Sequence, residues 1–438
     1  MTATAVMSAS RDGLPEASEA ALTPRVVIAN GLNRFHLAVA ASELQRRGAL
    51  AGFVTGAYPG RRSRLIGSVL NRSGSTRARR FLDRDENIES SRVEALWIPE
   101  LLGQLGSAAR SRGWKSPAER LDAAALRTFG LRARRAVRRH SDAEIYHYRS
   151  GFGLESTYEA RRRGMFALCD HSIAHPGVLE SLVESKGELG TPRLPRSRVL
   201  RSLSADLDAS DSVLVNSTFV RETFIHCGHD PGRIHVLYLG VDDRFLQSIP
   251  ATPRRNASGV LRLGFAGAFE ERKGVAVLVE ALSMVTAPWR LELAGPISGV
   301  MARKYASFLT DDRVRHRGNL SRSELARWLV DLDAFVFPSF AEGSARVVFE
   351  ALACGRFVIT TPNAGSIVDD GVHGRLVPPG DAVSLANALE ETAERLDDLE
   401  AIGAANAALV RRAYRQSHYS EGLVRLYRRL LTGTEVVR

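Results

Sequence analysis

Two glutamates, Glu342 and Glu350, stand eight positions apart around the point where the sequence predicts that a helix begins. The apolar residues 334–337 have the composition of a strand, and the Pro-Ser pair after them stops it. A helix is predicted to begin near Ser344, because glycine and serine there supply a flexible turn and a capping hydroxyl. It is predicted to end at Gly355, since glycine suits a left-handed C-terminal turn. Both carboxylates therefore fall close to the first turns of one helix.

The start of this predicted helix favours an anion. The backbone amides of Ser344, Ala345 and Arg346 would have no partners within the helix and would lie at the positive end of its dipole. Such a helix start binds phosphate groups. We therefore expect a bound phosphate at this position.

The spacing of the two acids suits a nucleoside diphosphate sugar. At roughly 1.5 Å per helical residue they lie on the order of 10 Å apart. With the diphosphate over the helix start, Glu342 would face the sugar hydroxyls and Glu350 the ribose hydroxyls, because an ionised carboxylate only accepts hydrogen bonds. The alternative interpretation is an ordinary strand, turn and helix that carries two solvated acids.

The surrounding residues resemble the signature of the large retaining glycosyltransferase family 4. The matching segments are Pro338-Ser339, Glu342-Gly343 and Glu350-Ala351-Leu352-Ala353-Cys354-Gly355. Further elements follow in the family's order, namely Gly267, Lys273-Gly274, Gly295, Gly318 and Asp370-Gly371 with Gly374. The resemblance covers about residues 255–380 closely. Upstream it is looser and rests on Gly31, His171 and Gly240-Val241-Asp242.

The resemblance implies a GT-B fold of two doubly wound, Rossmann-like α/β domains that face each other across a cleft. It implies a hexosyltransferase-like enzyme that moves a sugar from a nucleotide-diphosphate sugar to an acceptor hydroxyl, with retention of anomeric configuration and without a metal or other cofactor. Cell-surface glycan, glycolipid, polysaccharide and small-molecule acceptors are all compatible with it. The alternatives are a sugar-nucleotide epimerase or phosphorylase of the same architecture, or a catalytically silent nucleotide-binding protein.

The resemblance also implies roles for single residues. Glu342, His171 and Lys273 would be catalytic, with Glu342 positioning the transferred sugar, His171 facing it, and Lys273 stabilising the departing diphosphate. His175 is the rival candidate for the histidine. The expected donor-binding residues are Gly31, Gly267, Arg272, Lys273, Gly343, Ser344, Ala345, Arg346 and Glu350.

The chain departs from the family pattern at several positions. Many relatives carry arginine directly after the glycine that Gly267 matches, whereas this chain has Ala268. Lys273 and Arg272 must then supply the positive charge for the diphosphate. Ser344-Ala345 replaces the usual Phe-Gly, which changes side-chain shape and keeps the backbone amides.

Composition and length fit a two-domain enzyme. The chain has 438 residues, of which 44% are hydrophobic and 25% charged. A chain of this length is expected to form two domains of about 200 residues, each with its own hydrophobic core. Neither a run of about 18 apolar residues nor a secretory signal is apparent, so we expect a cytoplasmic protein. Three cysteines, Cys169, Cys227 and Cys354, suit a reducing compartment. Cys227 lies among histidines without a recognised metal spacing, so no metal site is predicted.

Short β-rich runs alternate with helical patterns, which predicts parallel sheets covered on both faces. The expected strands are 26–29, 52–55, 95–98, 144–148, 165–169, 212–215, 234–239, 261–266, 291–294, 314–317, 334–337 and 357–361. We expect a disordered arm over 1–22, an acceptor-side domain over 23–248, a nucleotide-sugar domain over 259–412 and a final segment over 413–438. In that segment, apolar residues at helical spacing predict a helix that crosses back to the first domain, or alternatively a simple surface helix. They are Tyr419, Leu423, Leu426, Tyr427 and Leu430.

The formal net charge of +11 is concentrated in one region. Residues 51–150 hold 20 lysines and arginines against 10 aspartates and glutamates. Arg61, Arg62 and Arg64 precede an apolar stretch, and residues 132–139 form an arginine-dense helix. These groups could hold the protein at the inner face of an anionic membrane or bind a lipid diphosphate acceptor. The alternative is a solvated face. Nucleic acid is not expected, because no binding fold accompanies the charge.

Overall fold

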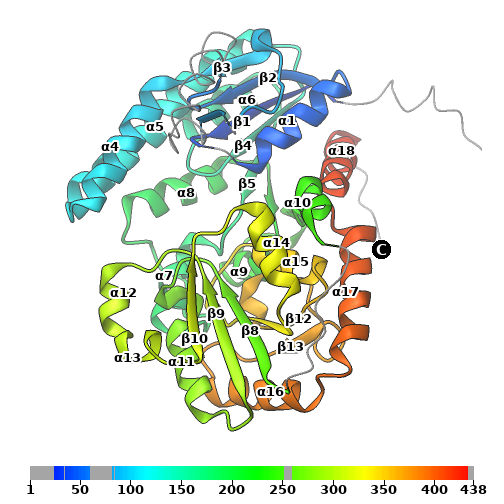
Figure 1. Cartoon of the computed structure of the whole chain (residues 1–438). Helices are drawn as coiled ribbons and strands as arrows, with labels where there is room; N and C mark the ends of the chain where they lie inside the picture. Colours follow the sequence, from blue (N-terminus) through cyan, green and yellow to red (C-terminus); the bar gives the residue numbers. More distant parts are fainter. Residues whose placement is uncertain (1–23, 34, 60–80, 83, 251–258, 433–438) are drawn as a thin grey trace, which may run out of the picture.

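The computed structural model describes residues 24–33, 35–59, 81–82, 84–250 and 259–432. They form two α/β units, each built around a parallel sheet (Figure 1). The first unit, uppermost in Figure 1, has the strand order β3-β2-β1-β4-β5-β6-β7, and the second has β10-β9-β8-β11-β12-β13. Each order reverses beside its first strand, which is the switch point where doubly wound folds bind ligands. The predicted fold class is confirmed.

The first unit begins with a strand whose residues are all buried. In chain order its elements are β1 (Val26–Gly31), α1 (His36–Arg46), β2 (Leu50–Thr55), β3 (Val93–Ala95), α4 (Trp97–Ser111), α5 (Lys115–Arg139), β4 (Ile145–Arg149), α6 (Leu154–Arg162), β5 (Phe166–His171), α7 (Pro176–Glu184), α8 (Arg198–Ala209), β6 (Ser212–Val215), α9 (Thr218–His226), β7 (Ile234–Val236) and α10 (Asp243–Ser248). Both faces of its sheet are covered, which explains why β1 and β2 are apolar without alternation.

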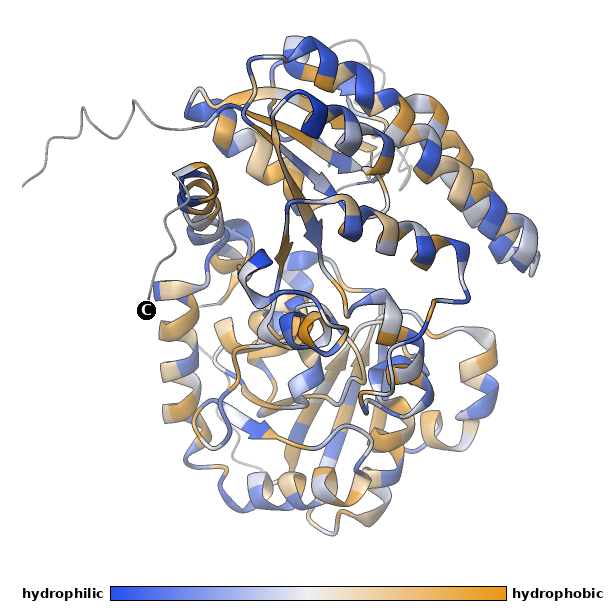
Figure 2. Cartoon of the chain, turned by 180° about the vertical axis from the view of Figure 1, so that it is seen from behind, coloured by the Kyte–Doolittle hydropathy of each residue, from blue (hydrophilic) through white to orange (hydrophobic). Residues whose placement is uncertain are grey.

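The second unit repeats this arrangement with a shorter sheet. Its elements are β8 (Leu261–Ala266), α11 (Val275–Met284), β9 (Trp289–Ala294), α12 (Gly299–Lys304), α13 (Ala306–Leu309), β10 (Val314–Gly318), α14 (Arg322–Val330), β11 (Ala334–Phe337), α15 (Arg346–Ala353), β12 (Phe357–Thr360), β13 (Gly374–Leu376), α16 (Ala382–Glu394) and α17 (Leu399–Ala413). Figure 2 shows hydrophobic residues along its strands and on parts of the covering helices.

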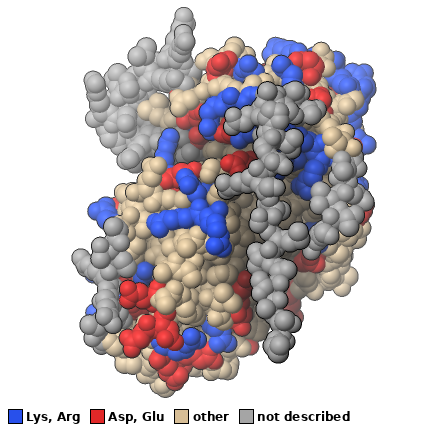
Figure 3. Space-filling model, turned by 90° about the vertical axis from the view of Figure 1, so that its right-hand side faces the viewer, with Lys and Arg blue, Asp and Glu red and all other residues tan. Residues whose placement is uncertain are grey.

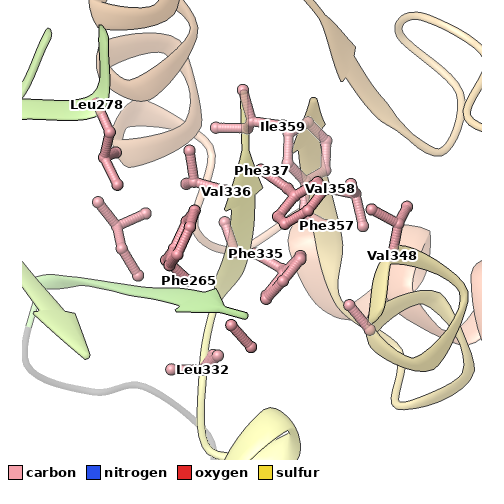
Figure 4. Close-up of a cluster of buried hydrophobic side chains, with 14 of the residues drawn as sticks. Phe265, Leu278, Leu332, Phe335, Val336, Phe337, Val348, Phe357, Val358 and Ile359 are labelled. Carbon is pink, nitrogen blue, oxygen red and sulfur yellow. The ribbon is translucent and has the colours of Figure 1, made fainter. Parts of the chain in front are cut away.

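The core of the second unit is centred on β11. Figure 4 shows Phe335 and Phe337 of this strand among side chains from β8, α15 and β12. The rings of Phe265 and Phe337 stack with their centroids 5.8 Å apart. This packing fixes the carboxyl ends of β8 and β11, from which the loops of the candidate site emerge.

One predicted strand is misplaced, and one observed strand was not predicted. The expected strand 95–98 ends at Ala95, and helix α4 begins at Trp97, because Pro99 in its first turn suits a helix start. Strand β13 was not predicted, since its three residues lie at the edge of the sheet and carry little apolar pattern. Its Gly374 packs so closely on β12 that a Cβ would lie 1.8 Å from the carbonyl oxygen of Val358.

The last helix, α18 (Gln416–Thr432), packs against the first unit (Figure 1). Tyr419, Leu423, Leu426 and Tyr427 are buried in the same cluster as residues of β1 and α1. The hydroxyl of Tyr427 lies 2.6 Å from Nδ1 of His147 on β4. The helix therefore ties the end of the chain to the first sheet.

Several expectations from the sequence fall on residues outside the described ranges. They concern the arm over 1–22, the arginines at 61, 62 and 64, and residues 251–258 between the two expected domains. Among the described residues, no helix is long and apolar enough to cross a membrane. In the same part of the chain, no three histidines, cysteines, aspartates or glutamates are grouped as metal ligands would be.

Candidate functional site

A cavity of about 370 Å³ opens at the carboxyl ends of β8, β9 and β11. It is lined by Gly267 after β8, Gly295 after β9, Phe337, Lys273, Glu342, the segment 344–347, Arg322 and Glu350, together with neighbouring residues. The carboxyl ends of strands on either side of a switch point are where doubly wound folds bind ligands. Most of the predicted donor-binding residues therefore share one cavity with Glu342, whereas Arg272, Gly343 and Gly31 are not among its lining residues.

Glu342 is the centre of a charged cluster at this cavity. Its Oε1 accepts hydrogen bonds from Lys273 Nζ at 2.7 Å, from Arg272 Nη1 at 2.8 Å and from Ser339 Oγ at 3.3 Å. Lys273 and Arg272 come from the short 3₁₀ turn Glu271–Lys273 that follows β8. Two cations and one carboxylate, all largely shielded from solvent, thus converge from two loops.

The glycine after Lys273 is required by the backbone. Gly274 has φ of 72°, and a Cβ there would lie 1.9 Å from the carbonyl oxygen of Pro338. Only glycine fits this left-handed conformation and close approach. Packing therefore requires glycine after Lys273, and the turn that this glycine allows places Lys273 in the cavity.

Glu350 lies on α15 and is almost fully buried. Burial raises the pKa of its carboxyl above the ordinary value, and the adjacent Arg322 opposes that shift. Arg322 forms an ion pair with Oε1 of Glu350, and its guanidinium carbon lies 4.6 Å from the ring centroid of Phe245. A buried carboxylate held by one arginine is a defined acceptor of hydrogen bonds.

Sequence reasoning missed Arg322. Its one signal lies in the start of α14, where Ser321 and Glu324 form a capping box. That box places Arg322 in the first turn of the helix, where a cation opposes the helix dipole. The ion pair with Glu350 offsets this unfavourable position.

The predicted start of the signature helix is wrong by two residues. Helix α15 begins at Arg346, its cap position is Ala345, and no side chain caps it. The amide of Ala345 donates to the carbonyl of Ala364 at 2.9 Å, so it is not open to an anion. Within the described part of the chain, the amides of Ser344 and Arg346 have no such acceptor. The helix ends at Ala353, two residues before the predicted end, and Gly355 has the predicted left-handed conformation with φ of 71°.

Gly343 lies where the two units touch. A Cβ on Gly343 would lie 1.9 Å from the carbonyl oxygen of Ser172, the residue after β5. The hydroxyl of Ser217, at the start of α9, donates to the carbonyl of Gly343. The glycine of the Glu-Gly pair therefore lets the second unit contact the first directly beside His171.

His171 ends β5 and is buried. Its Nδ1 lies 2.9 Å from the hydroxyl of Ser150, and burial lowers its pKa to about 4, so the ring is neutral at pH 7. His171 does not line the cavity itself, and its following residue is the one that contacts Gly343.

The rival histidine has a structural position. Nδ1 of His175 accepts the amide of Gly177 at 3.0 Å and caps α7. Its Nε2 lies 3.0 Å from Nε2 of His229, and burial lowers its pKa to about 3. Both nitrogens of His175 are thus engaged within the first unit.

Gly31 has a packing role in the first unit. Its φ is 76°, and a Cβ would lie 2.7 Å from the ring of Phe152. It does not line the cavity that contains Lys273 and Glu350. The close approach that the sequence predicted at Gly31 is therefore to an aromatic ring of the protein.

Many basic side chains of the first unit are paired. Arg138, Arg162 and Arg163 each contact Glu159, at 3.1, 2.9 and 2.9 Å, and together they lower the pKa of that carboxyl. Arg139 pairs with Glu94 at 2.9 Å. Figure 3 shows basic side chains grouped over the first unit, at the top of that face. The arginine-dense helix is therefore in part a network of ion pairs within the protein.

Comparison with known proteins agrees with this geometry. The sequence profile described as "Glycosyl transferases group 1" matches residues 261–395, and "Glycosyltransferase Family 4" matches residues 102–245. A D-inositol 3-phosphate glycosyltransferase of Paenarthrobacter aurescens is 28% identical over 250 residues, covering 53% of this chain and 60% of that one. Its counterpart from Xylanimonas cellulosilytica is 31% identical over 214 residues, covering 44% and 51%. The chain spans 60% or less of the length of these two relatives.

Solved structures share the fold. HepE of Anabaena in complex with UDP and glucose aligns with a TM-score of 0.57 at 15% identity, over 94% of this chain and 100% of that one. Sucrose-phosphate synthase of Thermosynechococcus elongatus aligns with a TM-score of 0.64 at 17% identity, over 94% and 100%. The two units of this protein thus form a GT-B fold, and the chain belongs to the group 1 glycosyl transferases of glycosyltransferase family 4.

Proposed function

We propose that this protein transfers a sugar from a nucleotide-diphosphate sugar to an acceptor hydroxyl. The observation that carries the proposal is that Lys273, Glu342 and Glu350 line one cavity at the switch point of the second sheet. Arg272 pairs with Glu342 beside Lys273. Cations suit the diphosphate, and carboxylates suit the hydroxyls of the two sugars. The family relatives named for glycosyl transfer support the same class of reaction.

In the proposed complex, Lys273 and Arg272 stabilise the negative charge that develops on the departing diphosphate. They supply the positive charge that a metal ion supplies in other enzymes, and we propose that no metal is required. Glu342 exchanges part of its contact with these cations for the hydroxyls of the transferred sugar. Oε1 of Glu350 stays with Arg322, and its second oxygen accepts the ribose hydroxyls.

We propose that the transfer retains the configuration of the sugar. The acceptor oxygen forms a bond to the anomeric carbon on the face from which the diphosphate leaves, and a leaving-group oxygen takes the acceptor proton. Glu342 supports the cationic character of the sugar in this step. His171, neutral at pH 7, faces the sugar from the first unit when the nucleotide sugar is bound.

The test is a transfer assay with UDP, GDP and ADP sugars, in the presence of EDTA, with proton NMR of the product. We expect one nucleotide to be released in step with product whose anomeric configuration equals that of the donor. An inverted product would contradict retention, and dependence on a divalent ion would contradict the role given to the two cations. HepE is described with UDP and glucose, so UDP-glucose is the first donor to try.

The same assay separates the alternatives. An epimerase would convert the donor sugar without transfer to an acceptor. A silent nucleotide-binding protein would bind the nucleotide and release nothing. Either outcome would replace the proposed function.

We also propose that α4 and the tip of its hairpin with α5 contact an anionic membrane surface. Trp97, Ile98, Leu101 and Leu105 are all about half exposed on α4, and Trp114 is 61% exposed at the tip. Arg112 and Lys115 flank Trp114. Tryptophan beside basic residues suits the interface of anionic lipids.

Sedimentation with vesicles of phosphatidylglycerol and phosphatidylcholine tests this contact. We expect binding at low salt that decreases when Leu101 and Leu105 are both changed to serine. The matched control is Leu194→Ser, which changes an exposed leucine outside the hairpin. Equal binding of all three proteins, or none by the wild type, would contradict the contact.

A further inference from the structure

A second and larger pocket lies in the first unit. Its volume is about 830 Å³, within the range of small-molecule sites. It opens at the carboxyl ends of β1 and β4, where Leu32 and Arg149 lie, and α4, α5 and the start of α8 form its walls. Like the donor cavity, it stands at the switch point of its sheet, between β1 and β4.

The acidic side chains of this pocket already have partners. Glu100 pairs with Arg84 at 3.0 Å, Glu119 accepts the backbone amide of Arg198 at 2.6 Å, and Asp122 pairs with Arg110. The negative charge of the walls is therefore compensated locally.

Arg149 forms no direct ion pair of this kind with any described residue. Its guanidinium carbon lies 4.0 Å from the ring centroid of Phe35 and 5.5 Å from that of Phe152. Its one hydrogen bond within the described chain is a long one of 3.4 Å to the carbonyl of Leu32. Burial lowers its pKa to about 10, and the charge of Asp170 opposes that shift.

The acid nearest to Arg149 along the sheet is itself occupied. Asp170 is paired with Arg149 in the β4–β5 register, and its carboxylate lies 2.8 Å from Nε2 of His36. The guanidinium therefore keeps donors for an external anion, and two aromatic rings hold its plane in place. A planar guanidinium in such a position binds carboxylate or phosphate through two parallel hydrogen bonds.

The position of Arg149 relates this pocket to the transfer reaction. Ser150, the next residue, contacts Nδ1 of His171 at 2.9 Å, and Ser172 contacts Gly343 of the second unit. Arg149 at the end of β4 is therefore one strand away from the end of β5, where the two units meet. A ligand held there by its charged end can direct a hydroxyl toward that point.

We propose that this pocket binds the acceptor, and that the acceptor carries a phosphate or carboxylate group that pairs with Arg149. The identification of the bound molecule as the acceptor rests on the proposed function. The binding of an anion at Arg149 does not depend on it.

The experiment uses pairs of probes that differ by one charged group, titrated calorimetrically into the full-length protein. The phosphate pair is glycerol 3-phosphate with glycerol, and the carboxylate pair is glucuronate with glucose. We expect one charged probe to bind the wild type at least about tenfold more tightly than its neutral partner. The pair that shows the difference identifies the anion.

Variants then locate the anion. Arg149→Gln should abolish the preference for the charged probe, and Arg149→Lys should restore part of it. Leu126→Glu adds a carboxylate to the pocket wall, leaves Arg149 in place and should weaken binding of the same probe. The matched control is Arg135→Gln, an exposed arginine on α5 that lies outside the pocket.

Two results would overturn the proposal. One is a wild type that binds neither charged probe better than its neutral partner. The other is an unchanged preference in both Arg149→Gln and Leu126→Glu, with each variant folded by circular dichroism. Failure of the proposed function appears differently, as absence of nucleotide-sugar binding and transfer while the anion titration still responds to Arg149.

Discussion

Lys273 and Arg272 both donate to one oxygen of Glu342, so a single carboxylate partly neutralises two cations at the candidate donor cavity. A diphosphate can replace that carboxylate as their counter-charge. Glu342 is then free to turn to the sugar. The three side chains are coupled by their charges, so removal of any one of them changes the charge that the other two experience.

Lys273→Ala should lower kcat by a factor on the order of 10² to 10³, because one preorganised donor at the departing group is lost. The measurement is steady-state release of nucleotide in the transfer assay. Lys304→Ala, at a lysine whose side chain is 55% exposed, serves as the control and should keep normal activity. Near-normal turnover of Lys273→Ala would remove this residue from the mechanism.

Glu350→Gln should weaken nucleotide binding about tenfold, since an amide is a poorer acceptor for ribose hydroxyls than a charged carboxylate and leaves Arg322 unpaired. Calorimetric titration of the nucleotide measures this change. Glu280→Gln, on the exposed side of α11, is the matched control. An affinity equal to that of the wild type would place the ribose elsewhere.

At the residue level, the sequence predicted the groups that the signature carries. Lys273, Glu342 and Glu350 do share one cavity, although their roles stay predictions. Arg322 and Arg149 were not predicted, because their contacts are with residues distant in the chain. Arg322 pairs with Glu350, and Arg149 stacks on Phe35. Spacing within a motif does not report such contacts.

At the scale of elements, helix α8 carries a buried carboxyl that links it to the start of α6. Oδ2 of Asp206 accepts the amide of Gly153 at 2.9 Å, and burial raises the pKa of Asp206 to about 7. The folded protein thus binds this proton more tightly than the unfolded chain does. The resulting stabilisation is complete below the ordinary pKa of 3.8 and is lost as the pH rises through about 7.

Asp206→Asn should therefore be less stable relative to the wild type at pH 5 than at pH 8, because the amide keeps the contact with Gly153 and does not titrate. The measurement is the melting temperature of both proteins across this range. Asp208→Asn, an exposed aspartate on the same helix, is the control. A difference between variant and wild type that stays constant with pH would contradict the buried titration.

Element boundaries show where local sequence is insufficient. Ser344 has the right chemistry for a helix cap, yet the amide of Ala345 pairs with Ala364 across the loop and delays the helix to Arg346. The short strand β13 forms because Gly374 fits closely against β12. In both places a tertiary contact decides the local structure.

At the scale of the whole molecule, the two units meet at Gly343, where a Cβ would collide with the carbonyl of Ser172. Gly343→Ala should push the units apart and lower transfer activity strongly, while each unit remains folded. Activity and circular dichroism measured together test this. Gly299→Ala, which adds a methyl at an exposed helix start, should have little effect. Full activity of Gly343→Ala would show that this contact is not needed for transfer.

Helix α18 joins the end of the chain to the first sheet through a buried hydrogen bond between Tyr427 and His147. Nε2 of His147 lies 3.6 Å from Oδ2 of Asp170, so loss of the Tyr427 hydroxyl would leave Nδ1 of the buried ring without its partner. Tyr427→Phe should lower the free energy of unfolding by about 1–3 kcal/mol. Denaturant unfolding measures it, with the exposed Tyr158→Phe as control. Equal stability of the two variants would show that the bond is dispensable.

The central claim is that the cavity of the second unit binds a nucleotide-diphosphate sugar through Lys273 and Glu350. The most direct test titrates UDP-glucose, GDP-glucose and ADP-glucose calorimetrically into the wild type and into the double variant Lys273→Ala, Glu350→Gln. We predict saturable binding of one nucleotide sugar to the wild type, weakened at least about tenfold in the double variant. Absence of binding by every donor, or equal affinity in the two proteins, would contradict the claim.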